Sequence, residues 1–195
     1  MDISEEGIAQ AQRLAKQTDL SDRARFIRCD VLELDAHLEQ RFDVVFTSYG
    51  VLNWLSDLSR WATIVARHLK PGGRFFIAEI HPASGIFDNL RSDFALRYDY
   101  FHTPEPVVDQ EPVPDYADPD YVSQTETHQW AWSLADIFDA LWGAGLEITE
   151  FKEYPYSCYR QFPQMTQGAD GFWHLPAGTP QIPLLFSLAA QHRQK

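Results

Sequence analysis

The sequence predicts a doubly wound α/β fold, and three observations lead to this prediction. Residues 41–82 read as strand, loop, helix, turn and strand, a β-α-β unit whose two strands run parallel. The chain has 195 residues, 45% of them hydrophobic, which is enough for a sizeable core. No internal repeat or linker divides it. We therefore expect a single domain over residues 1–195.

The central unit begins with Phe42–Thr47, a continuous apolar run of strand length. Its β-branched and aromatic residues are typical of a strand buried on both faces. A helix is predicted over Asp57–Leu69, where apolar residues recur at helical spacing and Ser56 or Asp57 can cap the start. We expect Pro71-Gly72-Gly73 to stop this helix and Phe75–Ile80 to form the second strand.

Ligands in such sheets bind outside the carboxyl ends of the parallel strands. Those ends correspond here to Ser48–Asn53 and Glu79–Pro82. His81 lies in the second of these segments, where an imidazole could orient or deprotonate a bound molecule near neutral pH. The alternative is a hydrogen-bonded turn histidine without a catalytic role.

The elements before the central unit are short. Ser4 can cap a helix whose first turn carries two glutamates, so a helix is expected to start about three residues into the chain. Ala24–Cys29 is predicted to be a short strand, and Leu32–Leu38 a helical turn.

After the central unit, residues 83–132 are rich in proline, aspartate and aromatic residues without a clear period. A connection of this length is usually a functional lid or a disordered insert, and the aromatic content favours a lid. The remaining elements are expected in the following order: an edge strand at Tyr121–Trp132, a helix at Leu134–Trp142 capped by Ser133, a strand at Leu146–Tyr154, an irregular segment at Tyr156–Pro180 and a last strand at Ile182–Ala190.

Composition narrows the function. The net charge of -12 opposes nucleic-acid binding, which depends on lysine and arginine. No apolar run is long enough to span a membrane, and the start of the chain lacks a signal pattern, so a cytoplasmic protein is expected. Cys29 and Cys158 do not suggest a disulfide framework. His81, His102 and His128 lack metal-ligand spacing, so no metal site is expected.

Several short stretches follow one another in a characteristic order and resemble the class I S-adenosylmethionine-dependent methyltransferases over nearly the whole chain. Each stretch alone is a weak signal, whereas their order and spacing are fairly specific. They are Asp2-Ile3-Ser4, Cys29-Asp30-Val31, Phe42-Asp43-Val44-Val45 with Ser48-Tyr49-Gly50, Leu69-Lys70-Pro71-Gly72-Gly73, and Ala140-Leu141 to Ala144-Gly145-Leu146 before the last strand.

The resemblance implies S-adenosylmethionine as the cofactor and methyl transfer to a small organic acceptor. By the same resemblance, Asp2 and Ile3 hold the ribose, and Asp30 and Val31 contact the adenine. The methionine part of the cofactor is assigned to the loop that carries Ser48 and Tyr49. The alternatives are a frayed terminal acid for Asp2 and a plain cap or turn for Asp30.

The acceptor pocket is predicted from aromatic residues of the insertion. His128 with Trp130, and Tyr98 with Tyr100, are the candidates to line it. The alternative is that these aromatic side chains form a small core under the long loop.

The chain departs from the family at its start. The family's first strand, the Gly-rich loop after it and most of the second strand have no counterpart before Asp2. Either the sequence is the carboxyl-terminal part of a longer enzyme with a truncated N-terminus, or it is a natural short form. In a short form, Ala24–Cys29 pairs directly with Phe42–Thr47, or a second subunit of a homodimer covers that exposed edge.

Two rival functions remain open. The first is a non-catalytic methyltransferase-like protein or partner subunit that does not bind cofactor by itself. The second is a nucleotide-dependent oxidoreductase, although the Gly-rich fingerprint of that class is also missing.

Overall fold

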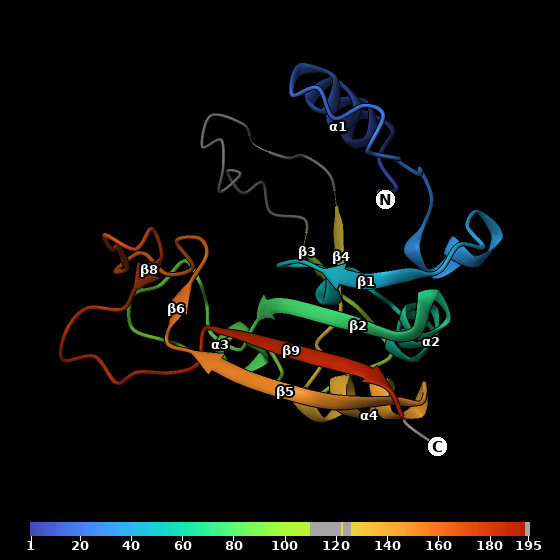
Figure 1. The fold of residues 1–195 in the computed structure, drawn as a ribbon. Helices are drawn as coiled ribbons and strands as arrows, with labels where there is room; N and C mark the ends of the chain where they lie inside the picture. The colour runs from blue at the N-terminus through green and yellow to red at the C-terminus, as the bar shows by residue number, and fades with distance from the viewer. Residues whose placement is uncertain (110–121, 123–125, 194–195) are drawn as a thin grey trace.

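A four-stranded sheet is the centre of the computed structural model, which describes residues 1–109, 122 and 126–193. The strands lie in the order β1-β2-β9-β5. β1 runs parallel to β2, while β9 is antiparallel to both β2 and β5. Figure 1 shows these strands side by side, with α1 (Glu5–Gln17) beyond the β1 edge. The strand bounds are β1 Phe42–Thr47, β2 Leu69–Ile80, β5 Leu146–Tyr154 and β9 Leu185–His192. The α/β fold predicted from the sequence is confirmed.

The main core lies between this sheet and two helices, α2 (Leu58–His68) and α4 (Leu134–Gly143). Trp61 of α2 meets Phe75 of β2 edge to face, with ring centroids 5.6 Å apart, and both side chains are buried. Both helices start where the sequence predicts, because Asp57 and Ser133 cap them through their side chains. The capping residues therefore fix how the two helices enter the core.

β1 is an edge strand, and the prediction that it is buried on both faces is wrong. Val44 is 56% exposed and Phe46 is 61% exposed. Among the described residues, β1 pairs with β2 alone. The apolar composition of the run could not distinguish an edge strand from a central one, because that depends on which segments lie beside it.

Ala24–Cys29 does not form the predicted strand and does not pair with β1. Within the described residues it makes one parallel bridge, between Arg28 and Asp2. The backbone N–H of Asp2 donates to Ile27, and the Cys29 N–H donates to Asp2. Only a short paired segment therefore forms here, outside the four-stranded sheet. The expected turn after it is present as the 3-10 helix η1 (Val31–Ala36).

The entry into β2 differs from the expected turn. α2 already ends at His68, and Pro71-Gly72-Gly73 lies within the first part of β2 rather than stopping the helix. Gly72 has a φ of +77°, and a side chain on Gly73 would meet backbone oxygens of Lys70, Phe42 and Asp43 at 3.0–3.1 Å. The two glycines therefore permit an irregular register, shifted between Phe42 and Val44, where β2 joins β1.

The insertion contains a short helix and a separate small sheet. α3 (Pro82–Gly85) follows β2 directly. β4 (Thr127–Gln129) pairs with β3 (Val107–Asp109), so the strand predicted within Tyr121–Trp132 does not join the edge of the main sheet. Residues 121 and 123–125 of that predicted strand lie outside the described residues.

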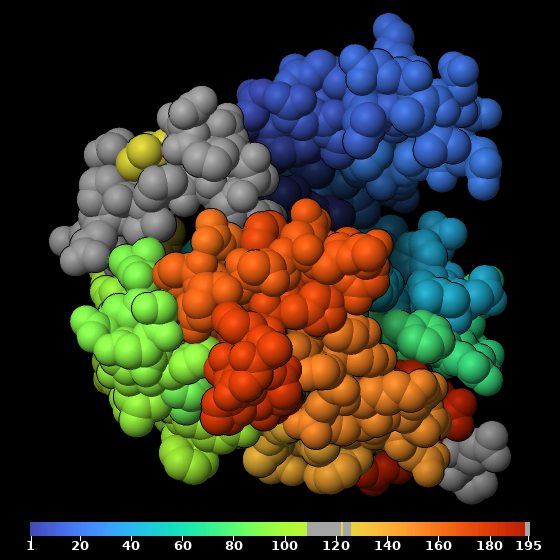
Figure 2. Space-filling view, turned by 90° about the vertical axis from the view of Figure 1, so that its left-hand side faces the viewer, coloured from blue at the N-terminus to red at the C-terminus, as the bar shows by residue number. Residues whose placement is uncertain are grey.

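The segment Tyr156–Pro180 is not irregular throughout, as the sequence suggested. It contains the short strands β6 (Tyr156–Ser157), β7 (Thr166–Gln167) and β8 (Trp173–His174), which form a three-stranded sheet in the order β6-β8-β7. Figure 2 looks onto this end of the molecule, where this segment (orange) occupies the middle of the face beside the segment around residues 85–105 (green). In the described part of the chain, no helix is long and apolar enough to cross a membrane.

Candidate functional site

The carboxyl ends of the two parallel strands meet at one edge of the sheet, as the β-α-β unit requires. Thr47 at the end of β1 is level with Ile77 in β2, two residues before Glu79. The loop after β1 runs through Gly50, which has a φ of +71°, into the 3-10 helix η2 (Leu52–Trp54). This edge of the sheet is where α/β proteins bind their ligands.

Glu79 holds the loop after β1 in place. Its side chain is buried and accepts hydrogen bonds from four backbone N–H groups. Three of them belong to consecutive loop residues, and the fourth is its own neighbour; they are Gly50, Val51, Leu52 and Ile80. Burial raises the pKa of Glu79, and these N–H groups lower it in part. The loop backbone is thus fixed by one carboxylate from the adjacent strand.

Ser48 and Tyr49 precede the fixed part of the loop. Ser48 is exposed. The Tyr49 side chain is 44% exposed, and burial raises its pKa, helped by the nearby acidic groups of Cys158 and Tyr154. Tyr49 therefore lies close to the end of β5 as well as to the end of β1.

A second group of predicted residues lies in the N-terminal segment. The Asp2 carboxylate accepts from the Ser4 N–H at 2.8 Å, and a side chain on Gly7 would come within 3.0 Å of its other oxygen. Ile3 is exposed, and its carbonyl accepts from the Arg28 side chain. The Asp2 carboxylate is therefore oriented by the first turn of α1, which needs glycine at Gly7.

Asp30 caps η1, because its carboxylate accepts from the Leu32 N–H at 2.8 Å. The next residue, Val31, packs against the main core. Asp2 pairs with Arg28 in a parallel bridge, and Asp30 follows Arg28 by two residues. Asp2 and Asp30 therefore lie at the same end of two neighbouring segments. The side-chain hydrogen bonds of Asp2 and Asp30 to described residues go to Ser4 and Leu32, not to Ser48 or Tyr49.

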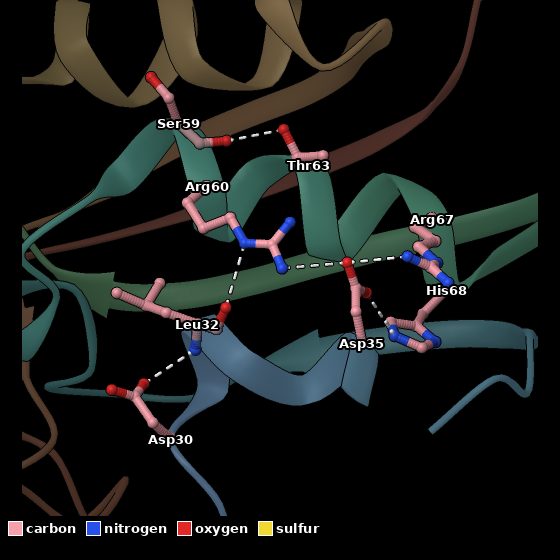
Figure 3. A network of polar contacts seen from close by, with 8 residues as sticks. All are labelled: Asp30, Leu32, Asp35, Ser59, Arg60, Thr63, Arg67 and His68. Carbon is pink, nitrogen blue, oxygen red and sulfur yellow. Dashed lines mark hydrogen bonds and ion pairs between the residues drawn. The ribbon is translucent and has the colours of Figure 1, made fainter. Parts of the chain in front are cut away.

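A partly buried polar network attaches η1 to α2. Asp35 of η1 is 12% exposed and pairs with Arg60 at 3.1 Å, Arg67 at 3.0 Å and His68 at 3.4 Å. Figure 3 shows these three α2 side chains converging on Asp35, with Arg60 also donating to the Leu32 carbonyl. The network therefore fixes the segment that carries Asp30 against the helix covering the main sheet.

His81 lies at the ligand end of β2, but its imidazole is only 3% exposed. Nδ1 accepts from the Ala83 N–H at 3.1 Å, so Nε2 carries the proton and donates to Glu153 at 2.8 Å. Burial lowers the pKa of His81, and Glu153 opposes this shift. Both ring nitrogens are thus engaged in contacts that hold the turn after β2. A catalytic role for His81 stays a prediction.

The four predicted acceptor residues belong to two separate parts of the insertion. His128 on β4 is half exposed and contacts Glu126 at 2.8 Å, while the Trp130 N–H of the backbone donates to Asn53 at the loop after β1. The Tyr100 hydroxyl accepts from the Leu134 N–H at the start of α4. Tyr98 contacts the guanidinium of Arg97 with its ring. Of the four, Trp130 is thus held directly against the loop of the candidate site.

Sequence reasoning missed two features of this end of the molecule. The first is the role of Glu79 in holding the loop after β1: the residue lies in a predicted ligand-binding segment, and the signal for its role was an acid at the end of the apolar run FFIAEI. The second is a pair formed by Asp170 and His174, whose spacing of four residues within a glycine-containing segment was a weaker signal. Both features depend on contacts that the linear pattern does not show.

Comparison with known proteins identifies the family. A family model described as a methyltransferase domain matches residues 1–131, more than half of the chain. The chain belongs to the class I methyltransferases. The cofactor used by this family is S-adenosylmethionine. No curated protein sequence matches the chain significantly.

Solved methyltransferase structures share the fold. An S-adenosylmethionine-dependent methyltransferase from Clostridium acetobutylicum has a TM-score of 0.61 at 15% identity, covering 97% of this chain and 72% of that one. The CcbJ methyltransferase from Streptomyces caelestis has a TM-score of 0.62 at 16% identity, covering 98% and 72%. The glycopeptide N-methyltransferase MtfA, complexed with S-adenosylmethionine, has a TM-score of 0.58 at 18% identity, covering 98% and 70%.

The residues of this methyltransferase fit the adenosine part of the cofactor. Asp2 and Asp30 each keep one carboxylate oxygen without a partner in the described part of the chain. Carboxylate oxygens accept hydrogen bonds from ribose hydroxyls and from an adenine amino group. In the same described part, no three His, Cys, Asp or Glu side chains are grouped to hold a metal ion.

Proposed function

We propose that this methyltransferase transfers a methyl group from S-adenosylmethionine to a small organic acceptor. The observation that carries the proposal is the loop after β1, which Glu79 fixes at the carboxyl end of the parallel strands. In a methyl transfer, the protein's main task is to align the acceptor with the reactive methyl group and to exclude water. A rigid loop at this edge of the sheet suits that task.

The proposal assigns the cofactor to six residues in two groups. Asp2 and Asp30, with Ile3 and Val31 beside them, would hold the adenosine part, and the loop that starts at Ser48 and Tyr49 would hold the methionine part. The cofactor supplies the methyl group as an electrophile on a positively charged sulfur. These residues position the cofactor, and the negative charge of Asp2 and Asp30 suits a positively charged molecule.

The acceptor is proposed to be a small molecule in a cytoplasmic enzyme. The net charge of -12 makes nucleic acid a poor acceptor. Trp130, held against the loop through Asn53, is the best placed of the predicted acceptor residues. His128, Tyr98 and Tyr100 belong to the same insertion and are proposed to close over the acceptor.

Isothermal titration calorimetry with S-adenosylmethionine, and with its demethylated product, tests the cofactor part of the proposal. We expect micromolar binding, about -8 kcal/mol. Replacing Asp30 by Asn should weaken binding about tenfold or more, since a charge-assisted hydrogen bond contributes about 1.5 to 3 kcal/mol. Asp139→Asn, on the exposed face of α4, is the matched control and should bind as the wild type does.

The outcomes of these titrations distinguish the proposed function from its two rivals. A folded chain that binds neither molecule would support the non-catalytic alternative. Binding of NADH in place of S-adenosylmethionine would support the oxidoreductase alternative. Equal affinity of the wild type and Asp30→Asn would remove Asp30 from the cofactor site.

A homodimer that covers the β1 edge is a separate part of the proposal. Val44 and Phe46 expose apolar side chains on an edge strand, an arrangement that favours pairing with another chain. Light scattering after size exclusion gives the mass in solution. A monomeric wild type would contradict this part alone.

A further inference from the structure

The small sheet β6-β8-β7 presents a cluster of aromatic rings just beyond the end of β5. Tyr156 of β6 is the centre of this cluster. Its ring centroid lies 5.2 Å from Tyr154 at the end of β5, 4.5 Å from Phe172 and 5.9 Å from His174. Aromatic side chains in such a cluster pack favourably against a further planar ring. We call Tyr154, Tyr156, Phe172 and His174 the aromatic wall.

A histidine of the aromatic wall is oriented by a carboxylate. His174 Nε2 lies 3.1 and 3.0 Å from the two carboxylate oxygens of Asp170, so in the neutral ring Nε2 carries the proton. The Nδ1 atom then has a free lone pair, and within the described part of the chain nothing contacts it through a hydrogen bond. The His174 side chain is 38% exposed, so a bound molecule can reach it.

The geometry around this pair requires glycine. A side chain on Gly168 would come within 2.6 Å of the Asp170 carboxylate and 3.0 Å of the His174 ring. The Phe172 N–H also donates to Asp170, at 3.1 Å. The His174 and Phe172 donors lower the pKa of Asp170, so its carboxylate stays ionised beside the imidazole. The Phe172 N–H therefore helps to fix the Asp170 carboxylate, and the space beside the pair admits only glycine at Gly168.

The aromatic wall lies at the same end of the main sheet as the loop of the proposed site, because Leu185 of β9 pairs with both Tyr154 at the end of β5 and Ile80 at the end of β2. Burial raises the pKa of Tyr156, and the acidic groups of Tyr154, Tyr49 and Asp170 raise it further. Tyr156 is therefore near both Tyr49, which follows β1, and the Asp170–His174 pair. Figure 1 shows β5 running toward the side of the molecule where β6 and β8 lie.

We propose that the aromatic wall binds a phenolic acceptor and that His174 Nδ1 accepts the proton of its hydroxyl group. The inference rests on the proposed function and names the substrate class of that site. Stacking on Tyr156 selects a planar ring, and the free Nδ1 lone pair selects an acidic hydroxyl. Asp170 is a positioning residue, because it holds His174 in the tautomer whose Nδ1 can accept.

The proton step balances without another reactant. The O–H bond of the phenol breaks, its electron pair stays on the oxygen, and a new N–H bond forms at Nδ1. The resulting imidazolium is stabilised by the Asp170 carboxylate and returns its proton to water. The phenolate oxygen is a far better nucleophile than the neutral hydroxyl, which is the usual gain from general base catalysis, about 100-fold or more.

The probe 4-nitrophenol tests the inference without requiring turnover, because its ionised form is coloured. With the demethylated cofactor product present, at a pH where the free probe is mostly neutral, binding should raise the phenolate absorbance. Tyr156→Ala should weaken probe binding about tenfold. His174→Gln should keep probe binding within about threefold but lose the absorbance gain. His192→Gln, on the last residue of β9 at the opposite end of the sheet, is the matched control and should keep both.

Nitrogen-15 NMR of the His174 ring tests the role of Asp170. The wild type should show a protonated Nε2 and an unprotonated Nδ1, and Asp170→Asn should lower the population of this tautomer. A structural role alone would leave the tautomer unchanged.

Three results would overturn the inference. Absence of saturable binding of the probe removes the aromatic wall as a site. Binding without a gain in phenolate, or a gain that His174→Gln retains, removes His174 as the proton acceptor. A gain lost only in His128→Gln places the acceptor on the insertion instead. Calorimetry measures binding of S-adenosylmethionine without the probe. A failure of the proposed function would appear there as a loss of cofactor binding, separately from these three results.

Discussion

Glu79→Gln is the most informative single substitution in this fold. The two side chains have the same shape, but the amide offers one accepting oxygen where the carboxylate offers two. Each oxygen of Glu79 serves two backbone N–H groups, so the amide nitrogen would face two donors and leave them without a partner. The substitution therefore removes two buried, charge-assisted hydrogen bonds while it changes almost no volume.

The magnitude follows from these two bonds. Hydrogen bonds to a charged group contribute about 1.5 to 3 kcal/mol each, which gives roughly 3 to 6 kcal/mol for two. Removing a buried charge offsets part of this loss. We expect a decrease in the free energy of unfolding of about 3 kcal/mol. At a slope of about 2 kcal/mol per molar urea, this lowers the urea midpoint by about 1.5 M.

Two assays check this expectation. Urea unfolding followed by circular dichroism gives the midpoint, with Glu147→Gln on the exposed side of β5 as the matched control. Hydrogen exchange of the Val51 and Leu52 amides reports the loop itself, and we expect their protection to fall more than that of amides in β9. A midpoint shift below about 0.5 M, with unchanged protection of the loop amides, would refute the assigned role of Glu79.

Three further predictions concern stability. Asp35→Ala leaves two arginines and a histidine of α2 without their shared carboxylate, and we expect a loss of about 1 to 2 kcal/mol in urea unfolding, since solvent screens the arginines. Because burial lowers the pKa of His81 from its usual 6.5, the unfolded chain binds a proton that the folded chain does not. The free energy of unfolding should therefore decrease as the pH drops below 6.5. When unfolding is measured at pH values above and below 6.5, this decrease should be smaller in His81→Gln than in the wild type. Ser133→Ala removes one half of the capping box of α4 and should lower the free energy of unfolding by about 1 kcal/mol, measured by thermal or urea unfolding.

Each of these predictions has a result that contradicts it. An unchanged midpoint for Asp35→Ala would mean that packing, not charge, attaches η1 to α2. The same pH dependence in the wild type and His81→Gln would assign the dependence to another group. Ser133→Thr keeps a hydroxyl and is the control for Ser133→Ala, so equal losses in the two would exclude the cap as the cause.

The sequence was a good guide wherever the signal was local. The bounds of β1 and β5, the cap of α2 at Asp57 and the cap of α4 at Ser133 were all predictable from the chain. A strand run, a helical period or a capping side chain acts within a few residues, so the linear pattern contains it. The order of the short motifs also sufficed for the family, which the family model confirms.

The tertiary structure decided which of these segments meet. Glu79 contacts a loop 27 to 29 residues earlier in the chain, and Tyr156 is paired with His174 across the sheet β6-β8. The exposure of Phe46 likewise depends on the position of β1 at the edge of the sheet, where β2 is its one paired strand among the described residues. Such contacts form only when packing brings distant segments together. The free energy of that packing depends on all the elements of the fold and not on the residues of one segment. The sequence by itself therefore determined the elements and the family, while the tertiary structure decided the geometry of the candidate site.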